Sequence, residues 1–413
     1  MQRLFIHIAE LGGLHTGHAP LRGKELAHWP HLRNAWLLTN HDRIAAFGAM
    51  ADLTPALQQQ ADEVVDVAGG LLLPGFIDAH THLVHAGSRE HEFLMKLQGA
   101  TYASIAAAGG GILSTAKAVQ TASEDELCTL AYKRLQQAIG QGTVGFEIKS
   151  GYGLTVADEL KMLRVIQRLQ QMVSVPIKAS LLGAHAIPPN YNTRRKEWVQ
   201  IVVQELLPAA AEAGLADYVD VFCEEGFFSI DDMLAIMAAG KKHGLAARVH
   251  VNQLTDSGAV EAAIAAGACT VDHLEQMTDK TIQQLALADT IGVLLPTAAW
   301  FLRLPFPPVR QLISAGAAIA LASDFNPGSS PSSNMHWVLA LACVQMKMTP
   351  AEAWNAASFN AACSLGWQHE LGSIAIGKKA SFIVSRPMPS LEYWPYAFGS
   401  NHIAQVYVNG QLA

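Results

Sequence analysis

The sequence predicts an α/β fold: a (β/α)8 TIM-type barrel with a small β-sandwich-like domain built from both termini. Three observations predict it. From about residue 144 onward, short β-rich runs alternate with longer amphipathic runs, and together with the apolar run 71–77 they give about eight strand–helix units. The two ends of the chain instead contain short β segments joined by turns. The length of 413 residues leaves room for one large domain and a smaller appendage.

The predicted barrel strands are short runs rich in apolar and β-branched residues. The first run covers 71–77. The later runs cover 144–148, 175–182, 218–222, 246–251, 270–273, 293–295 and 318–322. A doubly wound open sheet is the alternative arrangement, but no glycine-rich phosphate loop follows the first strand.

Amphipathic runs with helical periodicity lie between these strands. They cover 158–170, 198–213, 231–242, 257–266, 280–287 and 308–315. Ser229 before the third run and Gly244 after it are residue types that favour the two ends of a helix. Strands and helices therefore alternate in the way that a barrel requires.

Both ends of the chain predict a second, smaller β unit. Residues 43–47 and 405–408 are strand-like, and Asn409-Gly410 is a typical hairpin turn. We therefore expect three parts along the chain. These are residues 1–70 and 369–413, which form the small β domain together, and residues 71–368, which form the barrel domain.

The composition is that of a globular protein, with 50% hydrophobic and 15% charged residues. A formal net charge of -7 provides no basic field for a nucleic acid. The five cysteines are scattered singly, as in reduced intracellular proteins. Neither a secretory signal nor a run of membrane-spanning length is visible. We therefore expect a cytoplasmic protein with no nucleic-acid or membrane partner.

A pair of histidines follows the first predicted strand. His80 and His82 are two residues apart, so both imidazoles of a strand would face one side and could bind one ion. Two ordinary strand-end histidines are an equally good interpretation of this pair alone. Later strands end near His250, His273 and Asp324, and barrel enzymes build their sites from the carboxyl ends of strands. Imidazoles with one carboxylate suit a catalytic metal such as zinc or iron, with a position left for water.

Two of these residues have alternative roles. Asp324, in Ala-Ser-Asp-Phe-Asn-Pro-Gly, could instead form a turn or cap a helix. His273, in Val-Asp-His-Leu-Glu, could be a structural histidine. We expect His273 to polarise a carbonyl or move a proton rather than to ligate the metal.

Several motifs resemble a known family. Pro-Gly-Phe-Ile-Asp-Ala-His-Thr-His-Leu-Val (74–84) is similar to the general element of the amidohydrolase superfamily. Further motifs resemble its imidazolonepropionase family: Ala-Gly-Ser-Arg-Glu (86–90), Gly-Gly-Gly-Ile (109–112), Lys-Ser-Gly-Tyr-Gly-Leu (149–154), Gly-Ala-His-Ala-Ile-Pro-Pro (183–189) and Asp-Phe-Asn-Pro-Gly-Ser (324–329). The resemblance covers nearly the full chain, with the motifs in the same order.

The resemblance implies a metal-dependent hydrolase of cyclic amides within histidine degradation. The implied reaction is ring opening of 4-imidazolone-5-propanoate to N-formimidoyl-L-glutamate by attack of metal-bound water on the ring amide carbonyl. Arg89 would bind the propanoate carboxylate, for which a planar guanidinium is suited. The implied metal ligands are His80, His82, His250 and Asp324. The other implied substrate contacts are Tyr152, His185, Gln253, Asn326, Gly328 and Ser329. Taken singly, Arg89 could be a surface arginine and Tyr152 a packing loop residue.

Three residues would take part in the chemistry. Asp324 would accept the proton of the water and pass it to the departing ring nitrogen, while His273 or the metal polarises the carbonyl. Gln253 stands three residues after His250, where related deaminases have a glutamate that protonates a ring nitrogen. An amide cannot do this, so Gln253 would hold substrate by hydrogen bonds. Asn252 stands where the family usually has an acidic residue.

We expect one divalent or trivalent metal ion per chain, zinc or iron. Binuclear relatives have a bridging lysine near the end of the fourth strand, where this sequence has Cys223-Glu224-Glu225. Lys149 is expected to be structural or a charge partner. The alternatives are an aminohydrolase (deaminase) of a purine- or pyrimidine-like ring and a non-catalytic barrel that serves as a binding module. The expected partner is a small-molecule substrate with a carboxylate, and the family suggests a homodimer.

Overall fold

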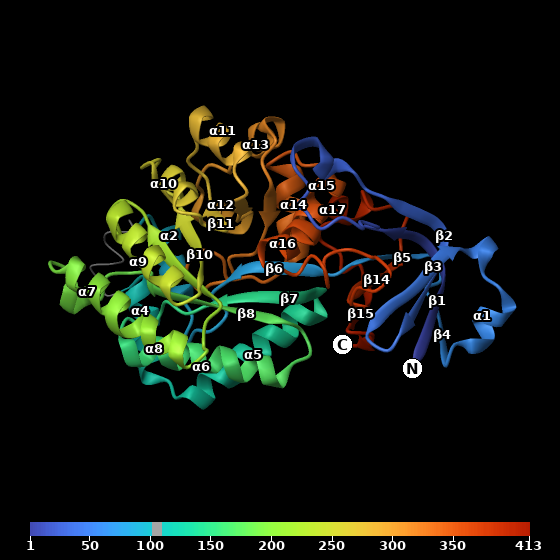
Figure 1. The fold of residues 1–413 in the computed structure, drawn as a ribbon, viewed down its shortest axis with the longest axis horizontal. Helices are drawn as coiled ribbons and strands as arrows, with labels where there is room; N and C mark the ends of the chain where they lie inside the picture. The colour runs from blue at the N-terminus through green and yellow to red at the C-terminus, as the bar shows by residue number, and fades with distance from the viewer. Residues whose placement is uncertain (101–109) are drawn as a thin grey trace.

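Two eight-stranded sheets make up the fold of this computed structural model, which describes residues 1–100 and 110–413 (Figure 1). A parallel sheet covered by helices forms the barrel. A mostly antiparallel sheet built from both ends of the chain lies beside it, with the N- and C-termini close together in the view (Figure 1). The predicted combination of a barrel with a terminal β unit is confirmed.

The barrel strands follow one another in sequence order, each parallel to the next. They are β6 (Phe76–Thr81), β7 (Thr143–Lys149), β8 (Ile177–Ala184), β9 (Tyr218–Cys223), β10 (Ala246–Val251), β11 (Thr270–His273), β12 (Ile291–Leu294) and β13 (Ile319–Leu321). Their residues are almost all buried, because helices cover the outside of the sheet and side chains fill the inside. The seven strands predicted after residue 144 all match an observed strand to within three residues.

The first predicted strand, 71–77, was wrong in part. Residues 70–74 form β5 (Gly70–Pro74), which pairs with β1 and β14 of the terminal sheet. The barrel begins with β6, two residues later. Both segments are fully buried, and the run 71–77 that joins them is apolar throughout, so hydrophobic periodicity could not tell which sheet each one joins. We keep 1–70, 71–368 and 369–413 as a proposed domain division, with β5 crossing into the terminal sheet.

The segment that follows β13 closes the barrel against β6. The backbone nitrogen of Asp324 donates to the carbonyl of His80 at 3.0 Å, and that of His82 donates to the carbonyl of Phe325 at 2.9 Å. Thr81 and Phe325 form a parallel bridge. The closure therefore lies at the carboxyl ends of the strands, among the predicted metal ligands.

Helices cover the outside of the barrel (Figure 1). They are α2 (Glu90–Leu97), α4 (Ile112–Thr121), α5 (Glu124–Gly140), α6 (Val156–Met172), α7 (Arg195–Ile201), α8 (Leu207–Glu212), α9 (Ile230–Lys242), α10 (Ala259–Ala265), α11 (Asp279–Leu287), α12 (Pro296–Leu302), α13 (Val309–Ala315), α14 (Met335–Val344), α15 (Pro350–Ala357) and α16 (Phe359–Ser364). All six predicted helices are observed; the one expected over 198–213 contains a π-helical turn, Val202–Leu206, between α7 and α8. Ser229 caps α9 with its side chain, as predicted.

The terminal sheet has the strand order β16-β15-β14-β5-β1-β2-β3, and β4 also pairs with β1. Its strands are β1 (Gln2–Gly12), β2 (His31–Asn40), β3 (Arg43–Ala49), β4 (Glu63–Asp66), β14 (Phe382–Pro387), β15 (Ile403–Val408) and β16 (Gln411–Leu412), with β5 between the two halves. Asn409 and Gly410, with φ of 49° and 75°, make the predicted turn between β15 and β16. Phe5, Phe382 and Tyr407 pack together in its core.

The remaining helices are short, and none of the helices in residues 1–100 and 110–413 combines the length and the apolar composition needed to cross a bilayer. They are α1 (Pro55–Gln60), α17 (Tyr393–Tyr396) and the 3-10 helices Gly23–Ala27, Met50–Asp52 and Pro189–Tyr191. All five cysteines lie in the described ranges and are free.

Candidate active site

Three histidines meet at the carboxyl ends of β6 and β10. One ring nitrogen from each of His80, His82 and His250 lies within 4.8 Å of the others. The Nε2 atoms of His82 and His250 are 3.3 Å apart. Oδ1 of Asp324 lies 3.5 Å from Nε2 of His80 and 3.5 Å from Nε2 of His82. The structure thus brings together the four residues that the sequence predicted as metal ligands.

The donor atoms fit a metal ion. Burial lowers the pKa of each of the three histidines well below its usual value, and neighbouring positive groups lower it further. The rings are therefore neutral, which is the form that binds metals. Nε2 of His80 is buried and has no hydrogen-bond partner among the described residues. The neutral rings point buried nitrogens toward one another, and a carboxylate lies beside them. A cation such as zinc or iron bound between these atoms would give the nitrogens the partner that they lack.

Buried aspartates fix two of these rings from behind. Oδ2 of Asp272 lies 2.7 Å from Nδ1 of His80, and Oδ1 of Asp220 lies 3.0 Å from Nδ1 of His250. A carboxylate at Nδ1 holds the proton there and leaves Nε2 free to ligate. Both aspartates come from barrel strands, β11 and β9, so the sheet itself orients the rings.

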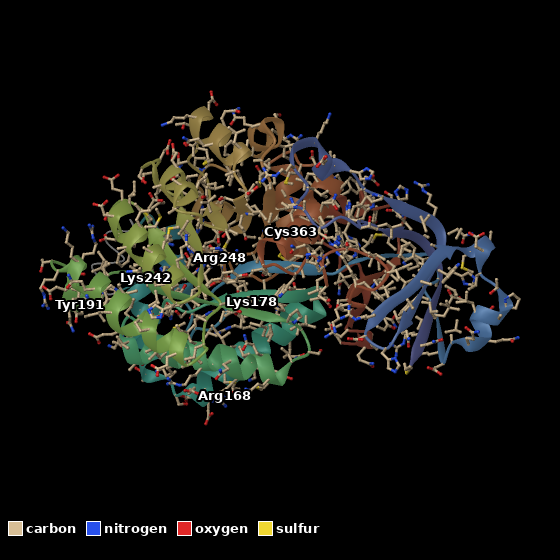
Figure 2. The ribbon with its side chains drawn as sticks, viewed as in Figure 1. Arg168, Lys178, Tyr191, Lys242, Arg248 and Cys363 are labelled. Carbon is tan, nitrogen blue, oxygen red and sulfur yellow. The ribbon has the colours of Figure 1, made fainter. Side chains whose placement is uncertain are left out.

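Two buried cations lie beneath these aspartates. Nζ of Lys149 is 2.7 Å from Asp220 and 2.9 Å from Glu147, and the guanidinium of Arg248 is 3.8 Å from Asp272. All of these side chains are fully buried, and Figure 2 labels Arg248 among the barrel strands. Charges in an apolar interior are stable only when they are paired. Lys149 is thus a charge partner, as expected, and the sequence-based reasoning missed the rest of this network.

His273 and Asp324 stand beside the histidine cluster in strained backbone conformations. Their φ angles are 88° and 51°, a region that residues other than glycine rarely adopt. Such strain is common at functional sites. Burial lowers the pKa of His273, but the nearby Glu275 carboxylate raises it and the net shift is upward. Burial raises the pKa of Asp324 to about 7.

A cavity of about 420 Å³ opens above the cluster, with His82, His250, His273 and Asp324 in its wall. All the predicted substrate residues line it too: Arg89, Tyr152, His185, Gln253, Asn326, Gly328 and Ser329. Lys96 and apolar side chains such as Phe222, Phe227 and Leu304 complete the lining, and the sequence-based reasoning missed them. Residues far apart in the chain thus share one site.

Arg89 is held in place by a glutamate one helical turn away. Its Nε and Nη2 atoms donate to Oε2 of Glu92 at 2.9 and 2.7 Å, and Oε1 of Glu92 accepts from the backbone of Gly111 at 2.9 Å. Gly328 faces the same guanidinium: a Cβ there would lie 2.0 Å from Nη1 of Arg89. Glycine is therefore required for this close approach. Spacing of three residues on a helix was the signal that could have identified Glu92. Gly109, the first residue of motif 109–112, lies outside the described residues.

The loop after Asp324 is held by its own side chains. Oδ1 of Asn326 accepts from the backbone of Gly328 and of Ser329, both at 2.8 Å. Nδ2 of Asn326 donates to the carbonyl of Asp324 at 2.7 Å, and the Ser329 hydroxyl donates to Oδ2 of Asp324 at 3.3 Å. These residues shape the cavity wall and the position of the Asp324 carboxylate at once.

Gln253 lies on a loop that a buried glutamate organises. The Glu224 carboxylate accepts from the backbone nitrogens of Gln253, Leu254 and Thr255 at 2.9, 3.0 and 3.0 Å, and from the Thr255 hydroxyl. Asn252 does not face this carboxylate; its Nδ2 donates to Asp256 and to the carbonyl of Gln276. The sequence pattern gives no indication that Glu224 holds this loop in place.

Two rings form a wall beside the histidine cluster. His185 stacks on His82, with centroids 5.0 Å apart and planes at 20°, and Tyr152 lies 5.2 Å from His185. Nδ1 of His185 is bonded to the carbonyl of Gly151 at 3.0 Å. Burial lowers the pKa of His185 to about 4 and raises the pKa of Tyr152 above its usual value, so both rings are neutral. Neutral rings of this kind can hold a small planar molecule.

Comparison with known proteins agrees with this site. A model of the amidohydrolase family matches residues 71–413. A curated protein from Christiangramia forsetii named imidazolonepropionase is 46% identical over 390 residues, which cover 94% of each chain. One of the same name from Flavobacterium johnsoniae is 45% identical over 397 residues, 96% of each chain. A triazine hydrolase variant (TM-score 0.76, 16% identity, 100% and 94% covered) and a guanine deaminase from E. coli (0.69, 16%, 100% and 99%) have similar folds.

Proposed function

Because the chain belongs to the amidohydrolase family and, within it, to the imidazolonepropionases, we propose that it opens the ring of 4-imidazolone-5-propanoate to give N-formimidoyl-L-glutamate. The chain is thus a hydrolase of cyclic amides. One observation carries the proposal: a three-histidine cluster with an aspartate borders the same cavity that the guanidinium of Arg89 lines. The substrate has a ring amide, which the metal site would hydrolyse, and a propanoate side chain, which the arginine would bind.

We propose one zinc or iron ion per chain, held by Nε2 of His80, His82 and His250 and by the Asp324 carboxylate. Such an ion lowers the pKa of a bound water to about 7 and polarises a carbonyl. The three neutral imidazoles and the two aspartates behind them support this ligand set. Histidine and carboxylate ligands suit both metals, so elemental analysis has to choose between them.

Substrate binding is assigned to the rest of the cavity. Arg89 pairs with the propanoate carboxylate. Tyr152 and His185 contact the ring, and the Gln253 amide hydrogen-bonds its polar edge. Asn326, Gly328 and Ser329 border the substrate on the opposite side through the loop that they hold in place.

The protons are moved by two residues. Asp324 accepts the proton of the attacking water and passes it to the ring nitrogen when the carbon–nitrogen bond breaks. His273, with Nδ1 3.5 Å from Oε1 of Glu275, uses its other nitrogen to donate to the carbonyl oxygen as negative charge develops there. The new carbon–oxygen bond and the protonated nitrogen give a carboxylate and an open chain.

Ring deamination is the weaker candidate, because the Gln253 amide cannot protonate a ring nitrogen. A non-catalytic binding module is weaker still, because all four ligand residues are present and converge. We also propose a cytoplasmic location, supported by five free cysteines, and a homodimer as in the family.

The decisive experiment uses freshly generated imidazolone propanoate. We expect N-formimidoyl-L-glutamate without ammonia release, one zinc or iron per chain by elemental analysis, and loss of turnover on chelation that the metal restores. If no product forms with metal-loaded protein, the substrate assignment is wrong. If chelation removes the metal and leaves turnover untouched, the metal-dependent mechanism is wrong.

A further inference from the structure

We propose that Lys96 is a second carboxylate-binding residue, which gives the end of the cavity beside Arg89 its net positive charge. The inference rests on the proposed function, since it concerns the propanoate of the same substrate. Lys96 lies on α2, two turns after Arg89, and lines the cavity together with it. The sequence motifs did not single it out.

The arginine alone does not provide a net charge. Arg89 and Glu92 form a buried ion pair in which the two side chains are 9% and 10% exposed. Two of the guanidinium nitrogens are engaged by one carboxylate oxygen, and the other oxygen is bound to the backbone of Gly111. The pair is formally neutral. A substrate carboxylate that bound to this pair alone would lose its hydrating water. In return it would contact a guanidinium whose positive charge is already neutralised by Glu92.

Lys96 supplies the missing charge. Among the described residues, no carboxylate lies within 4.0 Å of its ammonium, and residues 101–109, Thr-Tyr-Ala-Ser-Ile-Ala-Ala-Ala-Gly, contain no acidic side chain. Arg89, Glu92 and Lys96 together therefore carry one positive charge. That charge matches the single negative charge of a propanoate.

The charges of Arg89 and Lys96 also act on each other. Lys96 is half-buried, and burial followed by the charge of Arg89 lowers the pKa of its ammonium more than the Glu92 carboxylate raises it. Repulsion between two cations at one end of a cavity is relieved when an anion enters between them. Apolar side chains, Ile112 and Leu304 among them, line the same cavity and reduce the screening by water.

This arrangement assigns a substrate class. Flat cyclic amides that carry one side-chain carboxylate satisfy both ends of the cavity, whereas an uncharged analogue leaves Lys96 unpaired. Lys96 is therefore a specificity-determining residue. Its removal weakens binding of the anion and leaves the metal end unchanged.

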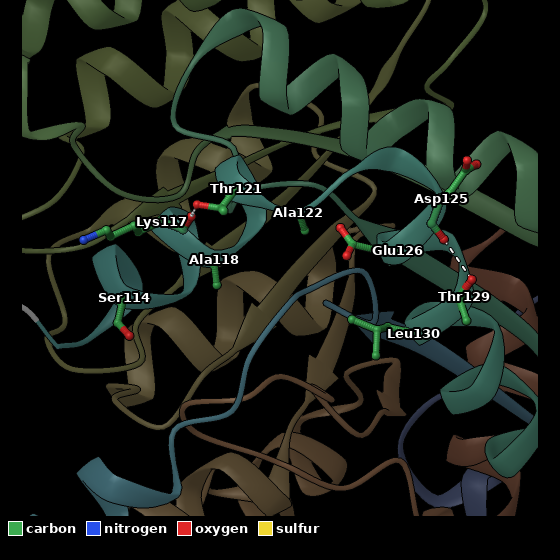
Figure 3. A pocket seen from close by; sticks show the side chains of 9 residues that line it. All are labelled: Ser114, Lys117, Ala118, Thr121, Ala122, Asp125, Glu126, Thr129 and Leu130. Atoms are coloured by element: carbon green, nitrogen blue, oxygen red, sulfur yellow. Dashed lines mark hydrogen bonds between the residues drawn. The ribbon is translucent and has the colours of Figure 1, made fainter.

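The test compares two stable ligands, imidazole-4-propanoate and its neutral amide, by calorimetry with metal-loaded protein. We expect the wild type to prefer the carboxylate, Lys96→Met to lose about five- to tenfold of that preference, and Lys96→Arg to keep it. KM for the substrate should rise by the same factor in Lys96→Met, with kcat changed less than twofold. Lys117→Met is the matched control: this exposed lysine lies on α4, in a hollow on the outside of the barrel (Figure 3).

Several outcomes separate this inference from the proposed function. If the wild type binds both ligands equally, or if Lys96→Met keeps the preference, Lys96 has no part in carboxylate binding. If Lys96→Arg behaves like Lys96→Met, a positive charge at this position is not what matters. If the wild type shows the preference and Lys96→Met loses it while the substrate is not hydrolysed, the proposed reaction fails and the anion site stands. An unchanged melting temperature excludes general unfolding of a variant.

Discussion

The two ends of the cavity are built in different ways. At the metal end, histidines and an aspartate stand at the ends of β6 and β10 and just after β13, and buried aspartates on neighbouring strands fix two of the rings. At the carboxylate end, Arg89 and Lys96 come from α2 and are positioned by Glu92 and by the loop at Gly328. The proposed reacting groups thus lie at or just after the ends of barrel strands, and the proposed carboxylate-binding groups lie on a connection between strands. Changes at the first end should act on metal content and kcat, and changes at the second on KM.

The strongest test of the metal end is His250→Ala. Removing one of three imidazoles should abolish stable metal binding and reduce kcat/KM by about a thousandfold or more. Elemental analysis and turnover measure both effects. His243→Ala, an exposed residue at the end of α9, should change neither. A His250→Ala protein that keeps its metal would remove this residue from the ligand set.

Asp272→Asn tests whether the barrel strands orient the ligands. Losing the carboxylate behind His80 should weaken metal affinity about 10- to 100-fold, with turnover recovering in part at high metal concentration. Titration against a competing chelator measures the affinity. Asp217→Asn is the control, because Asp217 pairs at 2.6 Å with Lys178, which Figure 2 labels, and touches none of the ligands. Equal metal affinities in the two variants would contradict the proposal that the Asp272 carboxylate orients His80 for metal binding.

Gly328→Ala should perturb the carboxylate end more than the metal end. The added Cβ would sit 2.0 Å from Nη1 of Arg89, so the guanidinium has to move. We expect KM to rise about tenfold with metal content unchanged, as for a displaced carboxylate ligand. Gly399→Ala, where a Cβ meets nothing within 4 Å, should leave KM as it is. A loss of metal in Gly328→Ala would mean that the two ends are coupled.

Glu224→Gln should have the smallest effect. The amide keeps the shape of the side chain but loses part of the acceptor capacity for the backbone of residues 253–255, so the Gln253 loop loosens. We expect a drop of about threefold in kcat/KM with metal bound normally. The neighbouring exposed residue provides the control variant Glu225→Gln. Identical kinetics in both variants would leave Glu224 without a role in positioning Gln253.

The sequence predicted the metal end better than the carboxylate end for a physical reason. Residues at strand ends are placed by strand order, so a correct set of strands brings His80, His250 and Asp324 together. The carboxylate end depends on how α2 and the loop at 328 are placed, which no periodicity encodes. Arg89 was found by resemblance, whereas Glu92 and Lys96 were missed.

The buried charged residues were also not predicted from the sequence. Asp272, directly before His273, and Arg248, two residues before His250, look like ordinary strand residues in the sequence. Only the closed barrel shows that both side chains are buried in the interior, where their opposite charges form an ion pair. The assignment of β5 failed similarly, because two adjacent buried strands look alike until their partners are known.

The closure of the barrel at the ligands has a consequence for its stability in solution. The amides of Asp324 and His82 both bond across the seam between β6 and the segment after β13, and the same two residues are among the proposed metal ligands. Opening this seam would therefore separate ligands, and an ion bound to them would oppose the opening by mass action. In hydrogen exchange, these two amides should be the ones in the barrel whose protection depends most on the metal.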